Sequence, residues 1–238
     1  KDLCGVPEAR AGALRSPFPA ENLGLWCARN ISTRYKDRAD SVEKIVALLY
    51  EMVCARAGNY LAFFPSYSYL EQVREVFCTA HPEVETLRQD TAMDEASRAD
   101  FLAQFTAAPG RTLLGFAVLG GVFGEGVDLA GERLIGAAIV SPGLPQVGPR
   151  QEQLRAHFEE TRGSGFDYAY RFPGMNKVLQ AAGRVIRTPE DKGVVLLIDD
   201  RFLAPDTRRL MPPHWDGLRA VGSAEELRAE LEWFWNNK

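Results

Sequence analysis

The chain has 238 residues, of which 46% are hydrophobic and 25% charged, and its formal net charge at pH 7 is -4. A chain of this length and apolar content buries a full hydrophobic core, which excludes an intrinsically disordered protein. The acidic balance excludes a domain that wraps nucleic acid through its bulk charge, so that any contact with DNA must be local.

The sequence carries no sign of a membrane segment or of a metal centre. No apolar run approaches the roughly 20 residues that span a bilayer, and the first residues do not resemble a signal peptide. Cys4, Cys27, Cys54 and Cys78 lie far apart, without the close pairs typical of zinc or iron–sulfur sites. We therefore expect a cytoplasmic protein with plain thiols, no metal site and no membrane partner.

Short apolar runs rich in β-forming residues alternate along the chain with longer amphipathic stretches. This alternation is typical of βα units around a mainly parallel sheet and predicts the α/β fold class. The predicted strands cover residues 23–31, 60–65, 112–119, 134–140 and 194–199. Helices are predicted at about 40–56, 67–79, 94–106, 150–162 and 175–187, with a last helix that opens at Ser223.

The sequence predicts one domain, because no internal repeat and no Gly/Ser-rich linker divides it. Residues 1–22, which are rich in proline, are expected to be a connecting segment that arrives from an absent neighbouring domain. Since the chain begins at Lys1 in ordinary sequence, we expect it to be a piece of a longer protein. Residues 141–174 are predicted to form an elaborated connection at the carboxyl edge of the sheet.

The most informative stretch is residues 180–187, which read Gln-Ala-Ala-Gly-Arg-Val-Ile-Arg. At about 100° per residue, Gln180, Arg184 and Arg187 fall within a sector of roughly 60° on one helix face, with Gly183 beside them. The planar arginine fork fits phosphate oxygens in two-point contact, and paired arginines neutralise charge that develops during phosphoryl transfer. This pattern predicts a phosphate site; for this stretch alone, a solvated basic face is the alternative.

A glycine-rich segment, residues 120–128, follows directly on the third predicted strand. It matches neither the dinucleotide fingerprint nor a P-loop, because Leu129 occupies the third glycine position of the first and Val127 the lysine position of the second. Glu125 and Asp128 would repel a phosphate but can accept hydrogen bonds from a ribose hydroxyl or from the two arginines. Taken alone, the segment is equally typical of a flexible turn.

Three segments together resemble the second RecA-like motor domain of superfamily 2 helicases, specifically the DinG/XPD-like DNA helicases. Residues 180–187 are similar to motif VI (Gln-x-x-Gly-Arg-x-x-Arg), residues 121–131 to motif V (ending Glu-Gly-Val-Asp-Leu-x-Gly) and residues 61–67 to motif IV (Leu-Ala-Phe-Phe-Pro-Ser-Tyr). Shorter matches flank them at residues 16–22, 32–38 and 199–202. The resemblance spans nearly the whole chain and implies a three-layer RecA-like domain over residues 23–238, with helices on both faces of the sheet.

The resemblance assigns catalytic roles to Gln180, Arg184 and Arg187. One or both arginines would act as arginine fingers, and the Gln180 amide would face the γ-phosphate of ATP beside them, across a cleft. Gly183 would lie beside the nucleotide. ATP and Mg²⁺ would both be held mainly by the absent first motor domain, which is therefore an expected partner.

The same resemblance assigns the remaining site residues. Glu125, Gly126 and Asp128 would bind nucleotide and couple the nucleotide cleft to the DNA track. Ser66 and Tyr67 would contact single-stranded DNA at a helix start, where free N–H groups and a hydroxyl suit a phosphate. A simple helix cap plus a packed aromatic ring is the alternative for these two residues.

Three aromatic residues, Tyr168, Tyr170 and Phe172, alternate near the end of the elaborated connection. Aromatic rings of this kind stack on single-stranded bases in nucleic-acid-binding proteins. Aromatic residues at a period of two are more typical of a half-buried strand, so a strand is the favoured interpretation here.

The departures from the family bound the predicted function. The chain has no Walker A sequence, no Walker B acidic box and no four-cysteine cluster, so we expect it to be inactive alone. The resemblance implies a 5′-to-3′ ATP-dependent DNA helicase in DNA repair or replication, whose parent chain can hold an iron–sulfur cluster outside this segment. The alternatives are a non-catalytic helicase-like binding module and an independent α/β enzyme that uses the arginine helix as an anion site.

Overall fold

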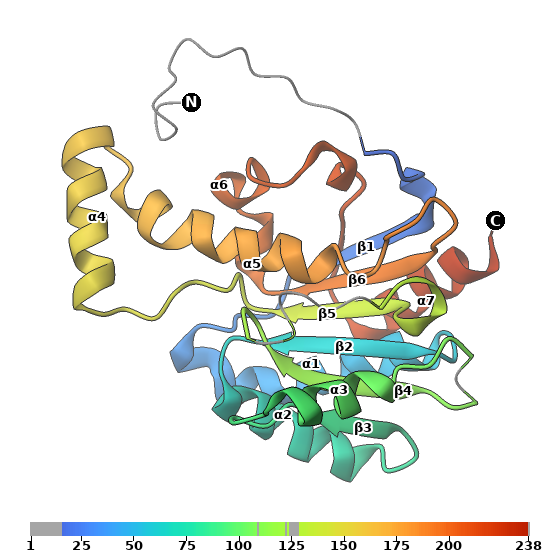
Figure 1. Ribbon diagram of the computed structural model, residues 1–238. Coiled ribbons are helices and arrows are strands. Elements are labelled where there is room, and N and C mark those ends of the chain that lie inside the picture. The colour runs from blue at the N-terminus through green and yellow to red at the C-terminus, as the bar shows by residue number, and fades with distance from the viewer. Residues whose placement is uncertain (1–15, 109, 122, 124–128, 238) are drawn as a thin grey trace.

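A seven-stranded parallel sheet is the centre of the computed structural model, which describes residues 16–108, 110–121, 123 and 129–237. The strand order is β3-β4-β2-β5-β6-β1-β7, and each pairing within it is parallel (Figure 1). The strands are β1 (Leu23–Ala28), β2 (Asn59–Phe64), β3 (Glu85–Arg88), β4 (Leu113–Val118), β5 (Gly136–Val140), β6 (Gly193–Ile198) and β7 (Arg219–Val221). The predicted α/β class with a mainly parallel sheet is confirmed.

The five predicted strands are the five central ones, and the two strands that the sequence did not predict are the two edges. Every residue of β2, β5 and β6 is buried, which explains their continuous apolar runs. In contrast, β3 reads Glu-Thr-Leu-Arg and is only partly buried, and β7 has three residues. An edge strand needs little apolar sequence, because neighbours cover only one of its sides.

Helices cover both faces of the sheet in three layers. The helices are α1 (Arg38–Cys54), α2 (Tyr67–Ala80), α3 (Glu95–Ala103), α4 (Pro149–Arg162), α5 (Phe172–Ala182), α6 (Pro205–Arg208) and α7 (Ala224–Asn236). One core cluster joins α1, α2 and α7 to one face, and the other joins α3 and α5 to the opposite face. The predicted three-layer arrangement is therefore present.

Alternation along β1 shows how one strand serves both cores. Trp26 belongs to the cluster under α1 and α7, whereas Cys27 belongs to the cluster under α5. Burial and the neighbouring Asp199 carboxylate raise the pKa of the Cys27 thiol to about 12. Cys27, Cys54 and Cys78 are free thiols, as predicted, and Cys4 lies outside the described residues.

The predicted helix 175–187 was wrong at both ends, since α5 begins at Phe172 and ends at Ala182. A five-residue π-helix, Asp167–Arg171, leads into α5, and Gly183 occupies the C-cap position. Glycine lowers helix stability by about 1 kcal/mol relative to alanine. Little free energy is therefore lost when α5 ends at Gly183, at the edge of the sheet.

Tyr168 and Tyr170 lie in the π-helix and Phe172 begins α5, so the strand interpretation of these three residues was wrong. Tyr168 stacks on Phe158 of α4 with ring centroids 4.5 Å apart, and the Tyr170 hydroxyl donates to Glu152 of α4 at 2.5 Å. None of the α4 residues is fully buried, and the helix lies apart from the sheet beyond its carboxyl edge (Figure 1). The aromatic rings therefore hold α4 against the π-helix.

A buried carboxylate joins the carboxyl ends of β1 and β6. Asp199 is fully buried and accepts hydrogen bonds from the Thr33 backbone N–H at 2.9 Å, from the Thr33 hydroxyl, and from the Arg201 guanidinium at 2.6 and 2.8 Å. Burial alone would raise the pKa of Asp199, but the Arg201 charge and these hydrogen bonds outweigh it and lower the pKa. This ion pair fixes the loop after β1.

Replacing Asp199 with asparagine should lower the free energy of unfolding by about 3 kcal/mol at pH 7, because it removes one partner of a buried ion pair. A lowered pKa means that the carboxylate stabilises the fold above its unfolded pKa of about 3.9 and loses this effect as the pH falls through the folded value. Urea titrations from pH 7 to pH 3 should therefore show the two proteins converging only below about pH 4. A difference independent of pH would contradict this account.

Candidate functional site

The two predicted arginines lie on a loop that follows α5, rather than on the helix itself. We call residues 183–191 the arginine loop. Its backbone leaves the helix in a tight turn, where the N–H groups of Arg184 and Val185 bond to carbonyls three residues back, at 3.3 and 3.1 Å. Gln180 is exposed on the last turn of α5. The predicted alignment of Gln180 with both arginines on one helix face was therefore wrong, because the helix ends before the first arginine.

The arginine loop lies at the amino edge of the sheet, since it runs directly into β6 (Figure 1). Gly193 at the start of β6 makes the close approach possible. A side chain there would place its Cβ 2.3 Å from the Val185 side chain and 2.8 Å from the Ile135 carbonyl oxygen. The loop is therefore pressed against the amino ends of β5 and β6.

One buried carboxylate, Asp191, sets the conformation of the arginine loop. It accepts the backbone N–H of Arg187 at 2.7 Å, the N–H of Thr188 at 2.8 Å and the Thr188 hydroxyl at 3.0 Å. Its side chain is 8% exposed. Sequence reasoning missed Asp191; the available signal was an acidic residue shortly after Arg187, a spacing at which aspartate often bonds its own backbone.

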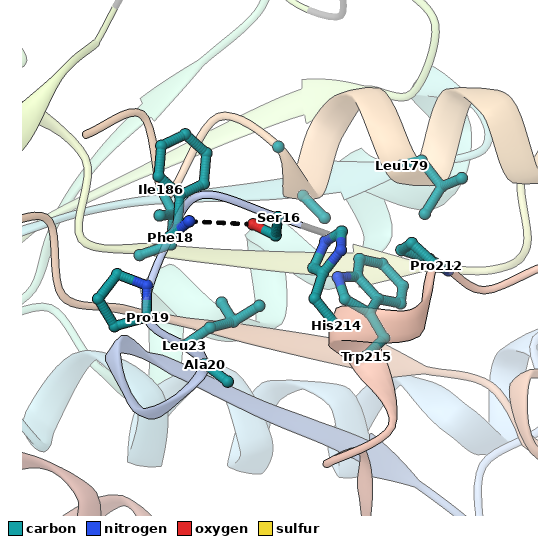
Figure 2. Close-up of a pocket in the computed structure, with 12 residues that line it drawn as sticks. Ser16, Phe18, Pro19, Ala20, Leu23, Leu179, Ile186, Pro212, His214 and Trp215 are labelled. Carbon is teal, nitrogen blue, oxygen red and sulfur yellow. Dashed lines mark hydrogen bonds between the residues drawn. The ribbon is translucent and has the colours of Figure 1, made fainter. Parts of the chain in front are cut away.

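An apolar pocket of about 330 Å³ borders the arginine loop. In Figure 2, Phe18 and Ile186 lie on one side of the pocket, and the rings of His214 and Trp215 lie on the other. Partial burial lowers the pKa of His214, which keeps its imidazole neutral at pH 7. The described part of the predicted connecting segment thus lines the same pocket as the end of α5, and the pocket suits an apolar group rather than a phosphate.

The glycine-rich segment lies within the connection from β4 to β5, which leaves the carboxyl end of β4 at Leu119. The connection ends at the amino end of β5, where the Ile135 N–H bonds to the Asn59 carbonyl at 3.0 Å. Gly120 has a φ of 74°, in the left-handed region that favours glycine. The predicted nucleotide-binding residues of this segment, Glu125, Gly126 and Asp128, lie outside the described residues.

Ser66 and Tyr67 begin α2 at the carboxyl end of β2. Ser66 is the N-cap, and its hydroxyl accepts the Tyr69 N–H at 3.4 Å. The Tyr67 hydroxyl accepts from Gln89 at 2.8 Å and donates to the Asp90 carbonyl at 3.3 Å, while its ring is half-buried. The helix cap of the alternative interpretation is present, and the Tyr67 hydroxyl is already engaged within the fold.

The structure does not bring the predicted site residues together in one place. Gln180, Gly183 and the two arginines lie at or near the amino edge, whereas Ser66 and Tyr67 lie at the carboxyl edge. The glycine-rich segment is the covalent connection between these edges from β4 to β5. This arrangement defines two separate surfaces, one rich in arginine and one at a helix N-terminus.

The described residues contain no candidate metal centre and no candidate membrane-spanning helix. No group of three or more His, Cys, Asp or Glu side chains within them is arranged to hold a metal ion. No helix in the same part of the chain has the length and apolar character needed to cross a bilayer.

The parallel three-layer fold, with an arginine loop at one edge and a helix start at the other, defines a RecA-like α/β domain. A solved apo structure of XPD has this fold: it matches with a TM-score of 0.68 at 17% identity, covering 84% of this chain and 40% of that chain. A family model described as the helicase C-terminal domain matches residues 49–217. The chain belongs to this helicase C-terminal domain family.

Two curated relatives are helicases of the predicted kind. The chain is 29% identical over 203 residues to the ATP-dependent DNA helicase YoaA of Escherichia coli, covering 84% of this chain and 30% of YoaA. It is 29% identical over 197 residues to the XPD helicase subunit of general transcription and DNA repair factor IIH from Dictyostelium discoideum, covering 77% of this chain and 25% of that subunit. The chain thus spans between a quarter and a third of their length, and the predicted resemblance to the C-terminal motor domain of XPD/DinG-like helicases is confirmed.

Replacing Asp191 with alanine should loosen the arginine loop while the sheet stays intact, because two backbone N–H groups lose their acceptor. We expect hydrogen exchange at Arg187 and Thr188 to accelerate by at least about tenfold, with β6 unaffected. The exposed neighbour Glu190 provides the control, since Glu190→Ala should leave these amides at their wild-type rates. Unchanged exchange in the Asp191 variant would show that the loop is held by other contacts.

Proposed function

We propose that this chain is the second motor domain of an ATP-dependent DNA helicase and that its arginine loop completes an ATP site held by the first motor domain. The observation that carries the proposal is that Arg184 and Arg187, the two arginines of the segment similar to motif VI, lie on a loop held at the amino edge by contacts of Asp191 and Gly193. The match to the helicase C-terminal domain family supports it.

Arg184 and Arg187 would supply positive charge to the γ-phosphate as it is transferred to water. Guanidinium groups remain charged at physiological pH and bind phosphate oxygens in two-point contact. Gln180 would position the attacking water or a phosphate oxygen from the end of α5, and Gly183 allows close approach of the nucleotide. Mg²⁺ and most of the triphosphate would be bound by residues of the first motor domain, so that this chain would contribute transition-state charge and positioning rather than the main nucleotide-binding site.

The carboxyl edge would form part of the track for single-stranded DNA. A helix N-terminus attracts a phosphate, and the half-buried Tyr67 ring offers a surface on which a base can stack. Since the Tyr67 hydroxyl is engaged with Gln89 and Asp90, the ring and the first turn of α2 are the groups available to DNA.

The two surfaces suggest a cycle in which ATP and DNA act on opposite edges of one rigid sheet. ATP would draw the arginine loop towards the first motor domain and close the cleft, and hydrolysis would release it. The glycine-rich segment, with Glu125, Gly126 and Asp128, would relay the change to the DNA side. We further propose 5′-to-3′ movement and a role in DNA repair or replication, by analogy with the XPD/DinG-like family.

Arg184→Ala in the full-length protein should reduce ATP turnover by about 10³-fold or more, the effect of removing an arginine finger. The melting temperature should change little, because the side chain lies on a loop outside the main core. Arg111→Ala is a matched control: its side chain is 62% exposed, pairs with Glu85 at the far side of the sheet, and contributes little to stability. Wild-type turnover in Arg184→Ala would remove the arginine loop from the mechanism.

The isolated chain should neither hydrolyse ATP nor unwind DNA, because it lacks the phosphate-binding loop of a motor domain. A phosphate-release assay with and without single-stranded DNA tests this directly. Turnover that disappears in Arg184→Ala would show instead that this chain holds a complete ATP site.

A further inference from the structure

Gln89, immediately after β3, connects the proposed DNA surface to the start of the glycine-rich segment. Its side-chain amide donates to the Tyr67 hydroxyl at 2.8 Å, and its side-chain carbonyl accepts the Val118 N–H at 2.8 Å. Its own backbone N–H bonds to the Phe116 carbonyl at 2.8 Å, which extends the ladder between β3 and β4 by one residue. One side chain thus spans three elements: α2, β3 and β4.

The Gln89 side chain lies directly against the turn that opens the glycine-rich segment. The Gly121 N–H bonds to the Val118 carbonyl at 3.0 Å, so Val118 belongs both to the end of β4 and to this turn. A Cβ at Gly121 would stand 3.1 Å from the Gln89 amide nitrogen, which leaves space there only for glycine or for a shift of the amide. Any movement of the Gln89 amide therefore changes its contacts with the backbone of the turn at Val118 and Gly121.

The contacts of Gln89 leave its amide little freedom to reorient alone. Gln89 is 2% exposed, and a buried amide that loses a partner is costly. Tyr67, in contrast, is only half-buried, so a ligand can reach its ring. A displacement of Tyr67 must either break its bond to Gln89 or move the amide, and with it the Val118 N–H.

We propose that Gln89 is a positioning residue that transmits DNA binding at Tyr67 to the end of β4 and the turn at Gly121, and so couples DNA binding to ATP turnover. This inference rests on the proposed function, in which Tyr67 contacts DNA and the connection from β4 to β5 ends at the edge of the sheet that faces ATP. Gln89 itself touches neither ligand. Its effect is on the coupling between the two sites rather than on either site alone.

The test replaces Gln89 with methionine, which has a similar length but no hydrogen-bonding amide, in the full-length protein. The readout is the ratio of ATP turnover at saturating oligo-dT to ATP turnover without DNA. Because the DNA is saturating, changes in DNA affinity do not affect this ratio. We expect this ratio to fall about tenfold, a typical coupling between two sites. Gln72→Met, the same change on the exposed face of α2, should keep the wild-type ratio.

Tyr67→Phe provides a second test that leaves Gln89 and its bond to Val118 in place. It removes only the hydroxyl, and we expect the ratio to fall by a similar factor. The double variant should fall no further than either single variant, because both break one connection. Multiplied losses in the double variant, or a wild-type ratio in folded Gln89→Met, would overturn the proposal.

Two results separate this inference from the proposed function. A wild-type protein that hydrolyses no ATP, or whose turnover DNA does not stimulate, contradicts the proposed function itself. If Gln89→Met does not fold, Tyr67→Phe decides, and a wild-type ratio in that variant overturns the coupling role of Gln89.

Discussion

The parallel direction of all the strands is the constraint on which the rest of the structure depends. Each connection must carry the chain from the carboxyl edge of one strand back to the amino edge of the next. The connection that contains the glycine-rich segment therefore leads from the carboxyl end of β4 to the amino end of β5, and α5 crosses towards the start of β6. This crossing places the arginine loop at one edge of the sheet and the start of α2 at the other.

Hydrogen bonds and close packing, rather than helix periodicity, determine where the arginines lie. Asp191 accepts two successive backbone N–H groups of the arginine loop, and Gly193 lets Val185 approach the sheet. A loop held in this way keeps charged side chains in position without burying them in a helix interface. The same principle applies at the carboxyl edge, where Asp199 ties the loop after β1 to Arg201.

Polar side chains buried at the carboxyl edge connect elements that are distant in the sequence. Gln89 joins the start of α2 to the end of β4, and each of its bonds would be costly to lose. Such a side chain stabilises the domain and also limits how α2 can move relative to β4. Under the proposed function, in which the domain responds to both DNA and ATP, this limit would pass a displacement at one site on to the other.

The sequence by itself determined the fold class, the five central strands and the helicase motifs, because continuous apolar runs, helical periodicity and motif spacing are local patterns. It did not reveal the edge strands β3 and β7, whose short and only partly buried sequences each pair with a single neighbouring strand. Helix periodicity placed Arg184 and Arg187 on α5, but the helix ends at Ala182, and the roles of Asp191 and Gln89 depend on contacts made only in three dimensions. Tertiary structure decided these points, because hydrogen-bond partners and close approaches between strands and loops are set by packing across the sheet and leave no periodic trace in the chain.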